Sequence, residues 1–150
     1  MKLIFSLLLV LGLVAPIASK AAMSNENNPH IMCVPLGSPA VDAVVLAGTS
    51  SARKMYVKAV ELLNAGSVAA SDTDFVVLEL LKGATVVAEL DSRAAHENGI
   101  AANTREPLNL VAAQVEIAAN SVLSVNYNET DAGTNVALTG AVLCIHYWVK

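Results

Sequence analysis

Apolar and polar side chains alternate along several short stretches of the chain, which is the period of a β-strand and not of a helix. The clearest alternation runs from residue 122 to residue 128, where Leu123, Val125 and Tyr127 are separated by Ser and Asn. The stretch 136–149 also alternates, but both of its sets of side chains are fairly apolar. We therefore expect this last strand to be central in a sheet or covered on both faces.

Residues 54–63 keep this alternation over only some of their length. Met55, Val57 and Ala59 fall on one side of an extended chain, and two lysines and a tyrosine fall on the other. The phase changes near Val60, which predicts a β-bulge or the end of a strand. A helix is the competing interpretation, because the Ala, Glu and Leu residues of this stretch are good helix formers.

Two apolar runs, residues 75–81 and 85–90, are separated only by Lys82, Gly83 and Ala84. Glycine adopts positive φ without steric strain, so this short separation predicts a tight hairpin.

Further strand-like stretches lie at residues 42–48 and 108–118, and the polar stretch 92–107 reads as a long connection. About seven to eight short strands without a sustained long helix predict an all-β domain of antiparallel strands. We expect a single β-sandwich or jelly roll over residues 41–150.

The first 22 residues have a different character. An apolar stretch, Leu3–Val14, follows a single lysine and ends before Pro16, and Ser19 and Ala21 occupy the −3 and −1 positions of a plausible cleavage site. This is the layout of a secretory signal peptide, and the stretch is short for a membrane-spanning helix. Three interpretations stay open: a cleaved signal, a retained membrane or assembly anchor, and a mis-assigned start with Met23 as the true first residue.

Residues 23–40 contain three of the five prolines and a cluster of Asn residues. Because proline cannot sit in a sheet interior, we expect an extended N-terminal arm or a first edge strand here.

Composition narrows the range of partners. Only 15% of the residues are charged and 55% are hydrophobic. This favours a surface partly covered by other subunits, since interface cores are depleted in charge. The alternative is an Ala-rich core with a surface of Ser, Thr and Asn. Without residues 1–22 the chain loses Lys2 and Lys20, which leaves seven basic and thirteen acidic side chains and a net charge of −6. An acidic domain without a basic cluster does not neutralise phosphates, so we expect no nucleic acid partner.

The two cysteines, Cys33 and Cys144, lie near opposite ends of the mature chain. In an exported protein they could form a disulfide that closes a loop of about 110 residues, worth about 4–5 kcal/mol in the chain-entropy model. The alternative is that Cys144 is a free thiol, which behaves as a small hydrophobic side chain within an apolar strand.

No set of residues predicts a metal site. The histidines, His30, His96 and His146, are far apart, and no His-x-x-x-His, His-x-His or Cys-x-x-Cys pair accompanies them. The loop Asn128–Asn135 has several oxygen ligands, but its spacing does not match a calcium loop, and its Asn, Asp and Gly residues suit an ordinary turn.

No catalytic grouping emerges either. The acidic pairs Asp72/Asp74 and Glu89/Asp91 resemble glycosidase carboxylates, yet each pair sits at i, i+2 beside a turn or strand end, where a solvated edge is the expected role. Neither a Gly-x-Ser-x-Gly elbow nor a phosphate-binding loop is present. We therefore expect a protein that is not an enzyme and that has no cofactor.

From about Asp42 onward, the sequence resembles the small β-sandwich modules of tailed-phage virions, of the head-decoration and head-fibre type. The stretches "AANSVLSVNYNETDAGTNVALTGAVLCIHY" and "RKMYVKAVELLNAG…FVVLELLKGATVV" carry this resemblance. It implies a structural role on a capsid, with contacts to a major capsid protein and to other copies of the chain in a trimer. It transfers no functional residue.

Two functions are therefore expected. The first is a non-enzymatic virion structural protein, a capsid decoration or minor head protein located in the virion. The second is an exported cell-surface or periplasmic binding or filament subunit, which follows from the signal-like start. A membrane is a partner only if residues 1–22 are retained.

Overall fold

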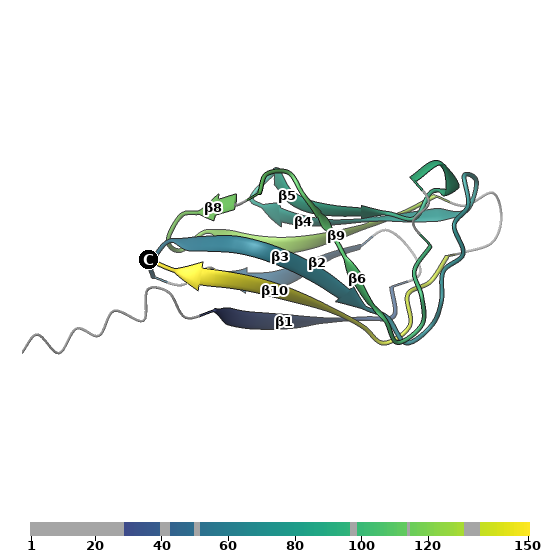
Figure 1. Ribbon diagram of the computed structural model, residues 1–150, viewed down its shortest axis with the longest axis horizontal. Coiled ribbons are helices and arrows are strands. Elements are labelled where there is room, and N and C mark those ends of the chain that lie inside the picture. The colour runs from purple at the N-terminus through teal and green to yellow at the C-terminus, as the bar shows by residue number, and fades with distance from the viewer. Residues whose placement is uncertain (1–28, 40–42, 50–51, 97–98, 114, 131–135) are drawn as a thin grey trace, which may run out of the picture.

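Two β-sheets pack face to face in the computed structural model, which describes residues 29–150 except 40–42, 50–51, 97–98, 114 and 131–135 (Figure 1). All strand pairs are antiparallel. The first sheet contains β1 (His30–Gly37), β10 (Ala141–Val149), β3 (Met55–Leu63), β6 (Arg105–Pro107) and β8 (Val115–Ile117). The second sheet contains β2 (Ala43–Thr49), β9 (Val122–Thr130), β4 (Phe75–Lys82), β5 (Thr85–Asp91) and β7 (Asn109–Leu110). The 3-10 helix η1 (Ala94–His96) follows β5.

The order of pairing is that of a jelly roll. β1 pairs with β10, β2 with β9, β3 with β6 and β8, and β4 with β5. If β6 and β8 are taken as one interrupted strand, the chain is a long antiparallel hairpin rolled into two sheets, which is how eight strands make a double-sheet jelly roll. The predicted all-β sandwich is therefore confirmed, with seven strands of at least seven residues and three of two or three residues among the described residues.

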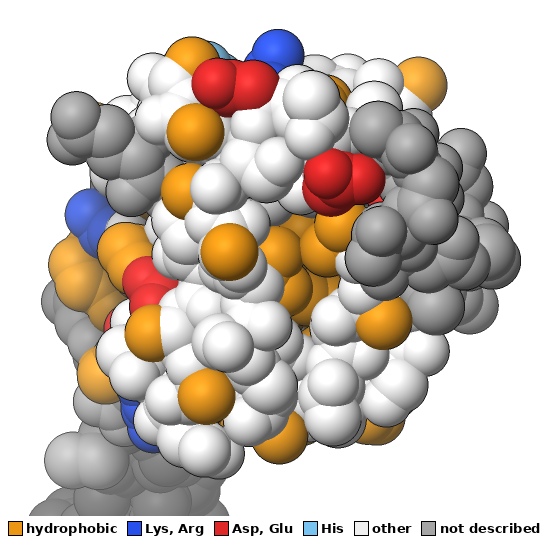
Figure 2. All heavy atoms as spheres, turned by 90° about the vertical axis from the view of Figure 1, so that its right-hand side faces the viewer, with side chains coloured by type: hydrophobic (Ala, Val, Ile, Leu, Met, Phe, Trp, Pro, Cys, Tyr) orange, Lys and Arg blue, Asp and Glu red, His pale blue; other side chains and the backbone are white. Residues whose placement is uncertain are grey.

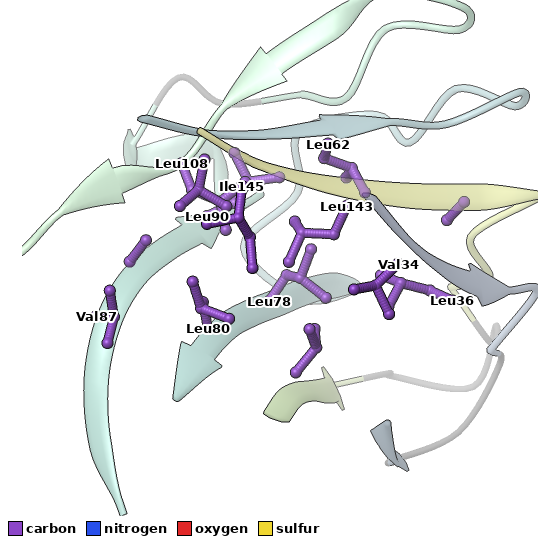
Figure 3. Close-up of a cluster of buried hydrophobic side chains, with 14 of the residues drawn as sticks. Val34, Leu36, Leu62, Leu78, Leu80, Val87, Leu90, Leu108, Leu143 and Ile145 are labelled. Carbon is purple, nitrogen blue, oxygen red and sulfur yellow. The ribbon is translucent and has the colours of Figure 1, made fainter. Parts of the chain in front are cut away.

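Both sheets contribute apolar side chains to one core between them. Figure 3 shows Val34, Leu143 and Ile145 of the first sheet facing Leu78 and Leu80 of the second. All five are buried, and the burial of alternate residues in each strand leaves the intervening side chains on the outer faces. Burial of this apolar surface is the main force that holds the two layers together.

The strand that begins at Met55 follows the phase change seen in the sequence. Met55 and Val57 are buried, and the next buried residues are Val60 and Leu62. The pairing between β3 and β10 shifts by one residue at Lys58, so the predicted bulge is present and the competing helix is not.

β10 is shorter than the predicted strand 136–149. Its first residue is Ala141, because Gly140 has a positive φ of 55° and breaks the extended chain before it. β10 lies between β1 and β3, in the central position that its apolar character predicts.

The proline-rich stretch 23–40 includes one strand of the sandwich. Residues 30–37 form β1, the edge strand of the first sheet, so the first edge strand that the sequence allowed is present and residues before 41 take part in the sandwich. Pro35 is tolerated because an edge strand needs fewer backbone donors than a central one. The interpretations of residues 1–22 and the remainder of the arm before His30 fall almost wholly outside the described residues. Where the structure describes the chain, no helix has the length and apolar character needed to cross a membrane.

Candidate functional site

The outer face of the first sheet carries three cross-strand rows of side chains over β1, β10 and β3. Strand register places Pro35, Val142 and Leu63 in one row, Cys33, Cys144 and Glu61 in the next, and Ile31, His146 and Ala59 in the third. We call these nine residues the outer face. Seven of them are apolar, and Ile31 and Leu63 are 59% and 41% exposed.

A disulfide links two residues of the middle row. Cys33 and Cys144 are direct partners in the β1–β10 ladder, with Cα atoms 4.1 Å apart, and their sulfur atoms are bonded. The pairing that the sequence allowed is therefore present, and no cysteine remains free. Because it ties the edge strand to a central strand, the bond holds the outer face together as one surface.

The two polar members of the outer face satisfy each other. Nε2 of His146 lies 3.1 Å from Oε2 of Glu61, and Nη1 of Arg105 in β6 donates to the same oxygen at 3.0 Å. Burial raises the pKa of Glu61, but the hydrogen bonds and charges of Arg105 and His146 lower it more, so the pKa is below its ordinary value of 4.5. The carboxylate is thus ionised and hydrogen-bonded by Arg105 and His146, which suits a contact surface better than a proton-transfer site.

The outer face of the second sheet is different in chemistry. Asn126 and Asn128 of β9 both donate from Nδ2 to Oε2 of Glu79 in β4, at 2.9 and 3.3 Å. Glu89 of β5 stands directly opposite Glu79. Of these two surfaces, as far as side chains are described, only the first presents a continuous apolar area.

The end of the sandwich shown in Figure 2 has a hollow of about 550 Å³. The connection between β3 and β4 contributes Val68, Ser71 and Asp74, and Val136 and Ala137 close the other side. Hydrophobic side chains form its floor (Figure 2). The hydroxyl of Tyr127 donates to the carbonyl of Val136, which fixes that wall against β9.

Asn64 holds the two connections around this hollow together. Its side chain is fully buried, its Nδ2 donates to the carbonyl of Gly66 at 2.9 Å, and its Oδ1 accepts from the amide of Thr139 at 2.7 Å. A Cβ at Gly66 would lie 3.0 Å from Oγ1 of Thr139, so the close approach of the two connections depends on glycine here.

The sequence predicts Asp91 at a solvated edge, and this prediction is wrong. The residue is 3% exposed, because β5 ends under the segment 92–96, which folds back over it. Its carboxylate accepts from the backbone amide and the guanidinium of Arg93, and Nδ1 of His96 lies 3.1 Å from its Oδ2. An Arg two residues after an Asp at a strand end is the sequence signal for this cluster.

Burial raises the pKa of Asp91, but the hydrogen bonds from Arg93 and the charges of Arg93 and His96 outweigh it, so the pKa lies below its ordinary value of 3.8. A pKa that folding depresses gives stability that is complete above the unfolded pKa and is lost as pH falls through the folded one.

We expect Asp91→Asn to lower the free energy of unfolding by about 1–3 kcal/mol at pH 7. It should also flatten the acid limb of the plot of this free energy against pH, below about pH 4. Chemical denaturation from pH 7 to pH 2 measures both effects. Glu89→Gln removes the same charge from the same strand and should change neither; equal acid limbs in Asp91→Asn and the wild type would contradict the assignment.

The other candidate residues are not brought together. His30 is in β1, His96 in η1 and His146 in β10, and no cluster of three metal-ligating side chains occurs among the described residues. Asp72 caps η1 by accepting from the amide of Ala95 at 3.0 Å, while Asp74 lines the hollow. Of the loop Asn128–Asn135, residues 131–135 lie outside the described residues. Every buried side-chain N or O atom of the described chain has a hydrogen-bond partner, so none of them points to an absent ligand.

Comparison of the chain with protein-family models, curated proteins and solved structures found no match.

Proposed function

We propose that the protein is a non-enzymatic structural subunit of a virion, a capsid decoration or minor head protein, which acts by contacts between copies of the chain and with a capsid protein. The observation that carries the proposal is the outer face, a largely apolar surface that is held by a disulfide, on a chain with only 15% charged residues. Such a surface suits the core of a subunit interface, where charge is depleted. Viral capsid proteins are among those that use the jelly-roll fold, and this is an argument by analogy only.

The occupant of the outer face is a neighbouring copy of the chain in a trimer. Burying an Ile or Leu side chain contributes about 1.5–3 kcal/mol, so a few such residues per subunit hold a modest interface. Glu61 is already matched by His146 and Arg105, so its burial at a contact leaves no uncompensated charge.

Replacement of Ile31 and Leu63 by Asp is expected to dissociate the trimer, because each change places a charge in an apolar contact. We expect the dissociation constant to rise at least about 100-fold, since each 1.4 kcal/mol is a factor of ten. Native mass spectrometry and analytical ultracentrifugation measure it. Val111→Asp is the matched control, because Val111 is 61% exposed but lies between β7 and β8, away from the outer face. A wild-type chain that stays monomeric, or a trimer that survives the double substitution, argues against this interface.

The virion setting has its own test. Mass spectrometry of purified particles is expected to detect peptides of the chain in a fixed ratio to the major capsid protein. Their absence from particles rules out the virion role.

A second candidate is an exported cell-surface or periplasmic binding or filament subunit. The disulfide favours it, because such bonds persist in oxidising compartments and are rare in the cytoplasm. The signal-like layout of residues 1–22 agrees with it. Sequencing the N-terminus of the mature protein separates the candidates: a start at residue 22 after cleavage supports export, and an intact residue 1 opposes a cleaved signal.

A further inference from the structure

Basic side chains gather at one end of the sandwich, the end at which the chain terminates in Figure 1. Of the seven basic residues in 29–150, four lie here: Arg53, Lys54, Lys82 and Lys150. Among the described acidic side chains, Glu116 alone lies with them, where its carboxylate is 2.7 Å from Nζ of Lys54 and its carbonyl accepts from Lys82 at 3.3 Å. We call this group the basic end.

Carboxylates gather at the opposite end of the long axis, where β3 leads into β4 and β9 ends. Asp72, Asp74 and Glu129 lie here, beside the Asp91–Arg93 pair, whose charges cancel. We call Asp72, Asp74 and Glu129 the acidic end. The fold therefore turns an acidic chain into a molecule with charges of opposite sign at its two ends.

The hollow at the acidic end suits a long basic side chain. Val68, Val136 and Ala137 offer apolar contact, and Ser71 and Asp74 offer oxygen atoms at the same site. Lysine and arginine commonly lay their aliphatic stems on apolar surface while the charged head meets polar atoms. The lining thus matches the side chains that the basic end presents.

We infer that the basic end of one copy docks on the acidic end of the next copy. The contact joins two different surfaces, and the surfaces lie at opposite ends of the long axis, so it repeats as a linear stack and does not close into a ring. The inference deepens the proposed function, on which it rests for the idea of assembly. It uses none of the nine residues of the outer face, so the two contacts can fail separately.

The test uses two charge-reversed chains, each made in the Ile31→Asp/Leu63→Asp background to remove lateral association. One chain carries Arg53→Glu and Lys150→Glu, and the other carries Asp72→Lys and Asp74→Lys. Each alone should remain monomeric because its two ends now have the same sign, and an equimolar mixture should associate because the native contact reforms between them. Light scattering and ultracentrifugation should show at least tenfold weaker association of the unreversed background on going from about 20 mM to about 500 mM salt, where screening shortens the reach of charges to a few Å.

A control separates docking from the effect of net charge. Glu79→Lys/Glu89→Lys, in the same background, has the same net charge as the acidic-end reversal, but its changes lie in the middle of the second sheet and leave both ends intact. By itself it should associate at low salt as the unreversed background chain does, whereas the acidic-end reversal by itself should stay monomeric. Equal association of these two chains overturns the inference, as does an unreversed background chain whose mass is the same at both salt concentrations. If the acidic-end reversal misfolds, Asp72→Asn/Asp74→Asn replaces it and should weaken association of the background chain at low salt.

Discussion

Replacing both cysteines, by Cys33→Ser and Cys144→Ser, is expected to lower the free energy of unfolding by about 4–5 kcal/mol. The disulfide joins residues separated by 111 positions, so it encloses almost all of the described chain. Breaking it restores a large amount of conformational freedom to the unfolded state, and the loss grows with the logarithm of the loop length. Domains of this size have a free energy of unfolding of only about 5–15 kcal/mol, so this single bond contributes a large fraction of it.

Denaturant unfolding followed by fluorescence of the one tryptophan, Trp148 in β10, measures the change. Wild-type protein with reductant should match the double variant, and reductant should not alter the double variant itself. Thiol titration of the denatured, unreduced wild type should find no free thiol. Two free thiols in native protein purified from its source would contradict the bond, and would also remove one of the two supports for an exported subunit.

The second large effect is expected at Asn64. Replacing Asn64 by Ala removes the partner of two backbone groups, the carbonyl of Gly66 and the amide of Thr139. A hydrogen bond contributes about 0.5–1.5 kcal/mol, so the two together should lower the free energy of unfolding by about 1–3 kcal/mol. The loss should be larger than for a surface substitution because the side chain has no exposed area.

The same variant should loosen the connections around the hollow more than the two sheets. Amide hydrogen exchange is expected to speed up at Ala65 and Thr139. Amides of the central strand β10 should stay protected and exchange only through global unfolding, at the lower global stability of the variant. Asn109→Ala is the control, since Asn109 is exposed in the short strand β7. A stability within about 0.5 kcal/mol of wild type would show that these bonds contribute little.

The sequence carries enough information for most of the strands, because the alternation of apolar and polar side chains is a local property. Phe75–Lys82 and Thr85–Asp91 flank Gly83, whose φ of 58° is the conformation that the short turn requires. The phase change near Val60 marks the bulge in β3 for the same reason: a bulge shifts which residues face the core. The predicted start of β10 is too early because residues 136–139 are apolar enough to extend the pattern, and apolar character alone does not separate a strand from a buried connection.

The candidate surfaces are less accessible to sequence reasoning. Asp91 is predicted to face solvent because the pair Glu89/Asp91 looks like an alternating edge, whereas the segment that buries it folds back only in three dimensions. The outer face joins residues from β1, β3 and β10, some of which are separated by more than a hundred positions. The alternation of side chains within one strand does not specify how that strand is aligned with a distant partner strand.

The sequence by itself determined the all-β class, the position of the main strands, the low charge and the presence of two cysteines that could pair. Tertiary structure decided which residues face one another: it set Cys33 opposite Cys144, gathered seven apolar residues on one outer face, and sorted basic and acidic side chains to opposite ends. The physical reason is that side-chain alternation depends on neighbours along the chain, whereas register and layer packing depend on burial shared between distant segments.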